Sequence, residues 1–515
     1  MNLLFDEYKN KVRGCWMGKN IGGVLGAPLE AKRGVFDYNT YLQEDLINHP
    51  QPNDDLDLQL VWLAAVEKYG RQVNASILGE YWLHYILPNW AEYGSGKNNL
   101  RMGLLPPLSG YDNNIYRDSC GCFIRSEIWA CLAPGHPDLA VHYAYEDAIV
   151  DHSTEGMYGE IFCAAVQSAA FAEQDRFKLI DIGLSYIPAE SDLAKAIRLA
   201  IQCYQSGVDW KEARIKILSA VPGTFGVQNM KVKDAPTDLP YGQSGYDAPG
   251  NVGIMVMAWL YGENDFGKSL NIANNCGEDT DCTCATLGAV LGIMNGYDSI
   301  PQEWISPIGD GIATCCINRL DGGIPIANTV TELTDQILNV TPSFLGRSFC
   351  DLLTKDGYTI TMKQGEALYY TRDEYQPDIN CDGAVRHKQF HEIIASPFVV
   401  NYKFVTFECD VDYMDVPYIR VNEARKIKLT FRDAVIKNHN QQWLTLKWYL
   451  PDGVQILPCN QVSFPLQSLY ESKTEFEFEI LCESFSNPKV ELIADITVNG
   501  HHSQNLLKVV LLPAC

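Results

Sequence analysis

The stretch from residue 274 to residue 296, NNCGEDTDCTCATLGAVLGIMNG, constrains the fold more than any other part of the chain. Its second half carries Gly288, Gly292 and Gly296 four residues apart, so these glycines lie on one face of a helix. A glycine inside a helix costs roughly 1 kcal/mol relative to alanine. We therefore expect this face to meet a neighbouring backbone closely, which would fix the acidic residues at the mouth of the helix.

Two short acidic clusters, PNDDLDLQLVW and GEDTDC, each open a largely apolar helix. Their polar members are Asn53, Asp54, Asp55, Asp57, Glu278, Asp279 and Asp281. Helix capping explains one such residue per site, but three or four carboxylates close together repel one another. We interpret the clusters as two halves of one metal site. Oxygen ligands favour a hard cation, namely Mg²⁺, with Mn²⁺ or Ca²⁺ as alternatives.

The first two thirds of the chain have the periodicity of helices. Apolar residues recur at helical spacing in residues 57–70, 158–174 and 192–207, and residues 252–262 are apolar nearly all round. Strands and helices do not alternate regularly, which argues against a Rossmann-type sheet. These features predict an all-α domain over residues 1–345.

After about residue 345 the pattern changes to the alternation of β-strands. Alternating segments at 357–371, 426–436, 443–450 and 474–482 are separated by turn sequences, which is typical of a β-sandwich. We place the sandwich at 386–515 and a connecting segment at 346–385, which either links the domains or holds the first strands. Residues 373–389 are expected to form a linker or an edge loop.

Charge and cysteine content limit the binding partners and the cellular compartment that we expect. The net charge of -24 argues against nucleic acid and anionic membranes as partners. Charged residues interrupt the N-terminal sequence, so it does not have the pattern of a signal peptide. The sequence contains no run of about 18 apolar residues, so we expect no membrane-spanning helix. The 17 cysteines are scattered and odd in number, which favours reduced thiols in the cytoplasm. The pairs Cys120/Cys122 and Cys282/Cys284 and the doublet Cys315/Cys316 suggest a zinc site, but no CxxC pair has a matching partner, so we do not favour zinc.

Five segments resemble motifs of the ADP-ribosylglycohydrolase family. Residues 277–296 are similar to the family signature GGDTDTxAAxxGAxxGAxxG, and residues 18–30 to GxxxGDxLGxPxE. Residues 53–57 stand where the family has TDDT, while 119–135 and 151–165 resemble its GNGAAMRxxPLG and TH segments. The resemblance covers about residues 10–345. It implies an ADP-ribosylglycohydrolase-like all-α domain, followed here by a sandwich-like all-β domain.

The same resemblance implies a two-Mg²⁺ centre and cleavage of a glycosidic bond at C1 of ribose. By position, the metal ligands would be Asn53, Asp54, Asp55, Asp279, Asp281 and Cys282. Combining these positions with nearby acidic and loop residues, we assign catalysis to Glu30, Asp55 and Glu127, and substrate binding to Arg125, His152, Asn251 and Glu278. The alternatives are a packing role for His152 and a helix-capping role for Asn251.

Several positions depart from the family pattern. Cys282 stands in place of Thr or Ser, and a thiol is a poor ligand for Mg²⁺, so one or two ions are expected. Glu278 replaces a glycine, and an extra acid suits cleavage of a neutral sugar better than binding of a pyrophosphate. We therefore predict a metal-dependent glycosyl hydrolase acting on an ADP-ribosyl conjugate or another glycoside. The alternative is a non-catalytic, crystallin-like or binding relative with a degraded metal site.

Other features leave alternatives open. Reading Asp279-Thr280-Asp281 as a glycosyltransferase DxD motif requires a nucleotide-binding α/β domain, which the pattern does not predict. Residues 94–116 are rich in turn formers and predict either a sugar-binding loop or a surface connector. In the β-domain, Trp443 and Trp448 should point to opposite faces of one strand. That domain would serve packing or homo-oligomerisation, with sugar binding as the second option.

Overall fold

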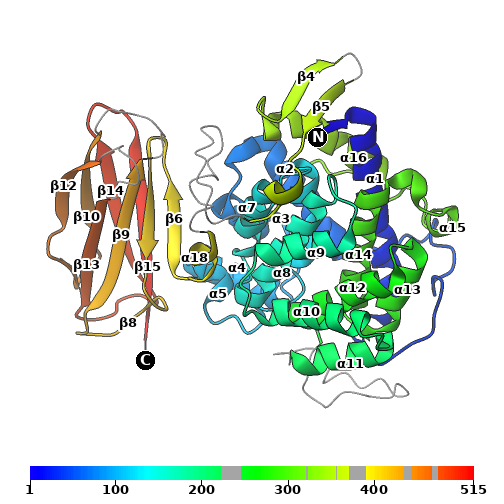
Figure 1. Ribbon diagram of the computed structural model, residues 1–515. Helices are drawn as coiled ribbons and strands as arrows, with labels where there is room; N and C mark the ends of the chain where they lie inside the picture. Colours follow the sequence, from blue (N-terminus) through cyan, green and yellow to red (C-terminus); the bar gives the residue numbers. More distant parts are fainter. Residues whose placement is uncertain are drawn as a thin grey trace. The chain divides into compact units, whose positions relative to one another are not determined.

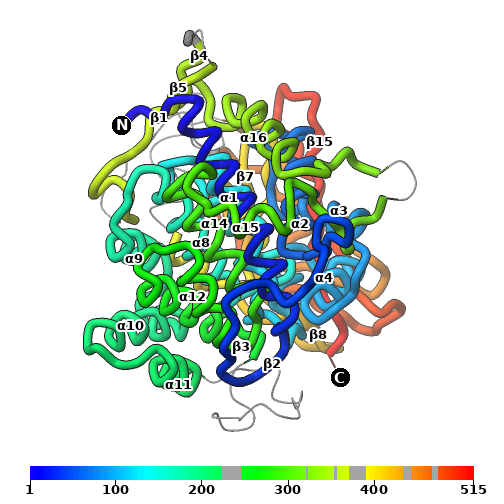
Figure 2. Tube along the Cα trace, turned by 90° about the vertical axis from the view of Figure 1, so that its right-hand side faces the viewer, coloured from blue at the N-terminus to red at the C-terminus, as the bar shows by residue number. Residues whose placement is uncertain are grey.

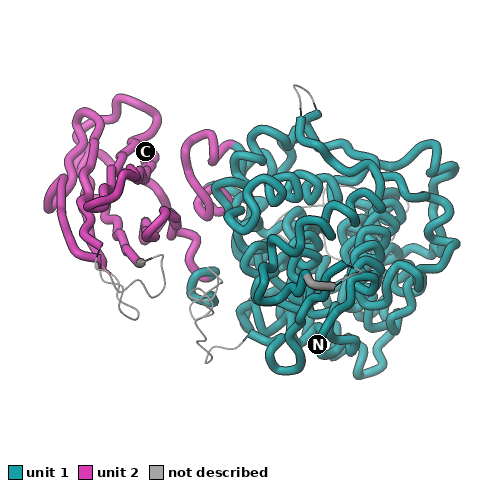
Figure 3. The backbone as a smooth tube through the Cα atoms, turned by 90° about the horizontal axis from the view of Figure 1, so that it is seen from above, with its two compact units in different colours: residues 1–97, 113–394 teal, residues 98–112, 395–515 magenta. Residues whose placement is uncertain are grey.

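The computed structural model describes residues 1–221, 245–319, 323–354, 357–370, 390–433, 442–466 and 474–514. These residues form two compact units, one of residues 1–97 and 113–394 and one of residues 98–112 and 395–515 (Figure 3). The first is helical and the second is built from β-strands, which confirms the predicted fold class. The predicted segment 373–389 lies outside the described residues. Within the described residues, every helix is too short or too polar to cross a membrane.

The helices follow the predicted periodicity (Figure 1). They are α1 Phe5–Gly26, α2 Asp54–Tyr69, α3 Ala75–Tyr85, α4 Ala91–Met102, α5 Leu108–Tyr111, α6 Glu127–Leu132, α7 Pro137–Ala148, α8 Thr154–Ala169, α9 Arg176–Ser185, α10 Asp192–Gln205, α11 Trp210–Ala220, α12 Ala248–Gly262, α13 Phe266–Asn275, α14 Thr280–Asn295, α15 Gln302–Ile305, α16 Val330–Leu345 and α18 Phe390–Ile394. The four helices expected from the sequence correspond to α2, α8, α10 and α12. Nearly every residue of α12 is buried, as its apolar sequence predicts.

Helices α1 and α14 touch backbone to backbone. A Cβ atom added to Gly18 would lie 2.0 Å from the carbonyl oxygen of Gly288, and one added to Gly14 would lie 2.3 Å from that of Gly292. Towards the other end, Gly22 meets the Cys284 carbonyl in the same way. The glycine face predicted on α14 therefore has a matching face on α1, and the two helices run antiparallel. This contact places the end of α1 beside the start of α14.

Two small sheets belong to the helical unit. Strands β1 (Asn2–Leu4), β5 (Gly357–Thr361) and β4 (Cys350–Thr354) form one sheet, in that order. Strands β2 (Lys32–Arg33) and β3 (Gly277–Glu278) pair antiparallel, next to each other in Figure 2. The alternation predicted over 357–371 is wrong beyond residue 361, where a 3₁₀-helix follows at Gly365–Leu368. Strands β4 and β5 are not strands of the sandwich, because β5 pairs with the N-terminal strand β1 on one side and with β4 on the other.

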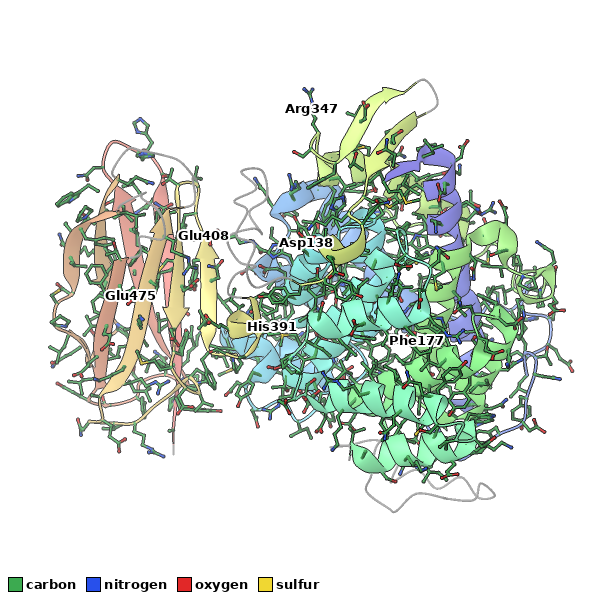
Figure 4. The ribbon with its side chains drawn as sticks, in the orientation of Figure 1. Asp138, Phe177, Arg347, His391, Glu408 and Glu475 are labelled. Carbon is green, nitrogen blue, oxygen red and sulfur yellow. The ribbon has the colours of Figure 1, made fainter. Side chains whose placement is uncertain are left out.

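The second unit is a sandwich of two five-stranded sheets, ordered β12-β10-β14-β15-β8 and β11-β13-β9-β7-β6. Its strands are β6 Val399–Lys403, β7 Phe407–Asp412, β8 Tyr418–Ile419, β9 Arg425–Asp433, β10 Gln442–Tyr449, β11 Val454–Leu457, β12 Gln461–Leu466, β13 Thr474–Cys482, β14 Val490–Val498 and β15 Gln504–Pro513. Alternate side chains face a shared core. Trp448 is 2% exposed and Trp443 46% exposed, so they point to opposite faces as predicted. On an outer face, Glu475 of β13 pairs with Lys428 at 3.0 Å (Figure 4).

Residues 98–112 pack with the sandwich. Leu104 and Leu108 are fully buried members of its hydrophobic core. The expected loop at 94–116 is largely wrong, because α4 and α5 occupy much of it. The side chain of Asn99 donates hydrogen bonds to the carbonyls of Ser109 and Asp112 rather than facing solvent. Turn-forming residues here stabilise a local helical corner.

The contact between α1 and α14 predicts a strong sensitivity to side-chain size. We expect Gly18→Ala to lower the unfolding free energy by about 1–3 kcal/mol, the range of overpacked cores, although alanine favours a helix by roughly 1 kcal/mol. Gly311→Ala is the matched control, because a Cβ atom there meets nothing within 4 Å. Thermal unfolding under reducing conditions measures both. Equal midpoints for the two variants would contradict the close contact.

Candidate metal centre

Acidic side chains from three elements meet in the helical unit. Asn53 caps α2 by accepting a hydrogen bond from the backbone N–H of Asp55 at 2.8 Å, and the first turn of α2 carries three aspartates. Asp279 stands at the start of α14, with Asp281 in its first turn. Glu30 follows the 3₁₀-helix that extends α1. Both helix N-termini stabilise negative charge, so their dipoles favour carboxylates at this place.

The structure brings most of the predicted metal ligands together. One ligand atom each from Glu30, Asp279 and Asp281 lies within 4.8 Å of the others, and so does one each from Asp55, Asp281 and Cys282. Asp281 belongs to both groups and joins the two predicted halves. Its Oδ1 and the Oδ2 of Asp55 are buried and accept no hydrogen bond. Lys19 Nζ, 3.8 Å from Asp55 Oδ2, offsets part of this charge, and the remaining buried carboxylate charge is costly unless a further cation compensates it.

Lys19 lies behind the carboxylates as a buried cation. Its Nζ is 3.8 Å from Asp55 Oδ2 and donates a hydrogen bond of 3.2 Å to Glu127 Oε1. The other Glu127 oxygen accepts a hydrogen bond from Gln59 at 2.9 Å, and Gln167 donates to Oε1 at 3.0 Å. Glu127 is fully buried. Its carboxylate is therefore held by internal donors, in contrast to the open position expected of a catalytic acid.

Mutual repulsion and burial shift the acidity of the cluster. The negative charge of Asp281, with partial desolvation of the carboxyl group, raises the pKa of Glu30 to about 8. Burial raises the pKa of Asp54 to about 6, and Asp281 adds to this shift. Burial also raises the pKa of Asp55 and of Asp279 well above the ordinary range. Without a cation, several of these groups therefore hold protons near neutral pH.

Glu278 has a different environment from the one predicted. Its backbone has φ +70°, a left-handed conformation that suits the glycine found at this position in the family motif. Arg33 makes two hydrogen bonds of 2.8 Å to its two oxygens, and Arg214 a third of 3.2 Å. Pairing of β2 with β3 adds to this anchor. Both carboxylate oxygens are engaged, so the geometry gives Glu278 a structural role and does not present it to a substrate.

Arg125 and His152 are also engaged in buried pairs. Arg125 is fully buried and bonds Asp147 at 2.9 Å and Asp151 at 2.6 Å. The Nε2 of His152 lies 2.8 Å from the hydroxyl of Ser119, and its Nδ1 lies 3.0 Å from Asp151. The geometry favours packing roles for both residues, one of the two alternatives stated for His152. Their proposed contact with substrate stays a prediction.

Asn251 and Cys282 shape the cluster from inside. The Oδ1 of Asn251 accepts a hydrogen bond from the backbone N–H of Asp279 at 3.2 Å, while its amide donates to the carbonyls of Gly245 and Asp247. Asn251 thus positions a candidate ligand. The Sγ of Cys282 lies 3.6 Å from Asp55 Oδ1, to which the thiol donates. Burial and the adjacent carboxylates raise the pKa of Cys282, so its thiol is neutral in the absence of an ion.

Three residues near the site were not predicted from the sequence to belong to it. Lys19 lies within the glycine motif of α1, and only its burial reveals its role. Tyr93 of α4 donates a hydrogen bond of 3.0 Å to Asp54 Oδ2. Tyr246 is half-buried, and burial together with Glu30 and Asp279 raises its pKa. Its place in the turn-rich run GYDAPGNVG was the available signal for an aromatic side chain beside the carboxylates.

The donor set fits a hard divalent cation. The described part of the cluster offers carboxylate oxygens from Glu30, Asp54, Asp55, Asp279 and Asp281. Two of their oxygens are buried without hydrogen-bond donors, and Lys19 is the cation paired with Asp55. Such an arrangement is stable at neutral pH when protons or cations offset the repulsion. Oxygen ligands of this kind suit Mg²⁺, Mn²⁺ or Ca²⁺.

Comparison with protein-family models agrees with the motifs. The sequence model of the family described as ADP-ribosylglycohydrolase matches residues 5–341. A solved structure titled "ADP-ribosylglycohydrolase-related protein complex" is 17% identical, with a TM-score of 0.41, and the alignment covers 66% of this chain and 99% of that one. A search of curated proteins finds no matching sequence.

The raised pKa values predict that the metal-free protein loses stability as the pH rises. Carboxyl groups of the unfolded chain titrate near about 4, so the folded state binds more protons above that pH. This contribution is complete below about pH 4 and is lost as the pH passes the folded-state pKa values of Asp54 (about 6) and Glu30 (about 8). We expect the melting temperature of Glu30→Gln to fall less than that of the wild type between pH 5 and pH 8.5.

Thermal unfolding in a chelating buffer measures this difference. Glu303→Gln, at an exposed position of α15, removes the same charge away from the cluster and should follow the wild type. If the melting temperature of Glu30→Gln falls with pH as steeply as that of the wild type, Glu30 does not hold a proton in the folded state.

Proposed function

The chain belongs to the ADP-ribosylglycohydrolase family, and from this premise we propose that it is a metal-dependent glycosyl hydrolase. It cleaves an N- or O-glycosidic bond at C1 of a sugar, in an ADP-ribosyl conjugate or another glycoside. The observation that carries the proposal is the convergence of Glu30, Asp279 and Asp281 within 4.8 Å, from segments about 250 residues apart in sequence. We place this activity in the cytoplasm.

The metal ligands in this proposal are carboxylates of α2 and α14. Asp54 and Asp55 contribute from the first helix, and Asp279 and Asp281 from the second, with Asn53 beside them as a neutral oxygen donor. A bound Mg²⁺ or similar ion supplies polarisation of sugar hydroxyls and water. Cys282 acts here as a hydrogen-bond donor to Asp55, since its neutral thiol is a poor ligand for a hard ion.

Glu30 is the residue that we assign to proton transfer. It is the solvent-exposed member of its group, whereas Asp279 and Asp281 are buried. A carboxylate at this edge can accept a proton from a water molecule that approaches from solvent. In the metal-free protein the charge of Asp281 raises the pKa of Glu30, and a cation held by Asp279 and Asp281 would offset this repulsion and leave Glu30 as a carboxylate that can accept a proton.

Asp55 and Glu127 are the remaining residues of the proposed active site. Lys19 contacts both, so the position of Asp55 depends on the Lys19–Glu127 pair. Gln59 and Gln167 hold Glu127 in turn. We therefore propose Glu127 as a positioning residue that acts through Lys19, in place of the direct catalytic role expected from the sequence.

Charge around the site bears on the substrate. The buried cations described above, Lys19, Arg33, Arg125 and Arg214, are each paired with a carboxylate. None of these four offers an unpaired charge to a pyrophosphate. Tyr246 supplies an aromatic surface beside Glu30 and Asp279 instead. Within the family chemistry, this supports a neutral sugar as strongly as ADP-ribose.

A non-catalytic, crystallin-like or binding relative is the second candidate. The observation in its favour is the hydrogen bond from Cys282 to Asp55, which satisfies part of the ligand set without any ion. Such a protein would keep the fold and lose the response to divalent cations.

The hydrolase proposal predicts stabilisation by Mg²⁺ or Mn²⁺. An ion at one hundred times its Kd adds about 2.7 kcal/mol to the unfolding free energy. Asp279→Asn should abolish the rise in melting temperature, whereas Asp298→Asn, an exposed carboxylate after α14, should keep it. A melting temperature that ignores the ions in the wild type would instead support the non-catalytic candidate.

The proposal also predicts an activity tied to these residues. A screen of ADP-ribosylated peptides and aryl glycosides, furanosides included, with Mg²⁺ or Mn²⁺ should yield a substrate. Glu30→Gln should lower kcat about 10²–10⁴-fold, the usual contribution of a general base, while the stabilisation by Mg²⁺ persists. Asp55→Ala should lose both activity and stabilisation. Full activity in Glu30→Gln would remove Glu30 from the mechanism.

A further inference from the structure

A second group of ligand-type side chains lies beside the first turn of α2. Asp57, Cys315 and Cys316 each offer one ligand atom, and these atoms lie within 4.8 Å of one another. The two Sγ atoms are 3.5 Å apart. The function proposed above uses none of the three, and the sequence motifs do not include the cysteines.

The backbone holds this group in a defined geometry. One oxygen of Asp57, Oδ2, accepts hydrogen bonds from the backbone N–H groups of Cys315 at 2.7 Å and Cys316 at 2.6 Å. The carbonyl of Cys316 accepts a hydrogen bond from the N–H of Leu87 at 2.8 Å, after the end of α3. An antiparallel bridge between Ile86 and Ile317 extends this contact. The cysteine pair is thus fixed on both sides.

The remaining oxygen of Asp57 has no such partner. Asp57 is 0% exposed, and its Oδ1 accepts no hydrogen bond. A buried carboxylate oxygen left without a donor is costly, so it calls for a compensating group. Cys315 is exposed and Cys316 buried, so an ion could enter from the Cys315 side. The ligand atoms of this site are therefore held in place by the backbone, and the site is open to solvent on the Cys315 side.

The spacing of the sulfurs matches a thiophilic ion. Zinc–thiolate bonds of about 2.3 Å at a tetrahedral angle separate the two sulfurs by about 3.8 Å. The observed Sγ–Sγ distance of 3.5 Å requires only a small adjustment. Thiolates select borderline and soft cations, whereas an all-oxygen site selects Mg²⁺. The two clusters thus differ in donor chemistry.

We propose that Asp57, Cys315 and Cys316 bind a thiophilic divalent cation of the Zn²⁺ class. Asp57 Oδ1 and the two sulfurs provide three ligands, and a water molecule takes the fourth position on the exposed side. Binding displaces the two thiol protons, which pass to the solvent. The ion ties the segment around Cys315 to the first turn of α2, whose Asp54 belongs to the candidate metal centre.

Cd²⁺ titration of the reduced, metal-free full chain tests this proposal. The ultraviolet sulfur-to-cadmium charge-transfer band should saturate at one equivalent, with release of about two protons per ion. Zn²⁺ added in competition should bleach the band. Cys315→Ser and Cys316→Ser should each weaken binding about tenfold or more, and the double variant should lose the band. Cys459→Ser, at another exposed cysteine, is the matched control and should behave as wild type.

Asp57→Asn tests the proposal with a variant that should fold normally. Its amide oxygen can still accept the two backbone hydrogen bonds, but an NH₂ group replaces the free oxygen. We expect a properly folded variant with weaker Cd²⁺ binding. An unchanged band in the double cysteine variant, or a band lost only in Cys282→Ser, would overturn the proposal. Asp279→Asn should lose stabilisation by Mg²⁺ and keep the band, which separates this site from the proposed hydrolase centre.

Discussion

The backbone contact between α1 and α14 is the constraint on which the candidate centre depends. Glycines at 14, 18 and 22 of α1 meet Gly292, Gly288 and the Cys284 carbonyl, with no room for a Cβ atom. Each glycine costs about 0.5–1 kcal/mol in helix stability, which the dense packing must offset. The antiparallel arrangement then sets the end of α1 against the start of α14. Glu30 reaches Asp279 and Asp281 only because the two helices approach this closely.

Charge is the second constraint. Carboxylates from α2, α14 and the end of α1 converge beside one buried lysine, Lys19. Around this group, other buried charges are neutralised in local pairs, such as Glu278 with Arg33 and Arg214. The contrast is informative, because the chain pairs its structural charges and leaves oxygens of Asp55 and Asp281 without donors. Oxygens left without donors inside a group of converging carboxylates indicate a binding site rather than a general excess of acid.

Periodicity correctly predicted helices and strands that are buried uniformly, on one side or on all sides. The apolar run of α12 and the alternation of β10 and β13 appear where expected, because burial on one or all sides leaves a regular pattern. Residues 94–116 were misjudged, since asparagines that bond nearby carbonyls resemble those of an open loop. Likewise, the partners of Glu278 come from residues 33 and 214, far away in sequence. Such pairing depends on the tertiary fold, which local pattern does not specify.

The first turn of α2 illustrates the same limit most sharply. Asp54, Asp55 and Asp57 are identical in chemistry and adjacent in sequence, yet each meets a different partner. Asp54 accepts from Tyr93, Asp55 lies near Lys19 and Cys282, and Asp57 accepts from the backbone of the two cysteines. Asp55 points to a different side of the helix from Asp54 and Asp57, which are three positions apart and share a face, and the same helix dipole stabilises all three carboxylates in their distinct surroundings. Oxygen-rich surroundings favour a hard ion, and the sulfur pair beside Asp57 a softer one. The sequence motif therefore locates the acids, while the neighbours of each side chain decide their chemistry.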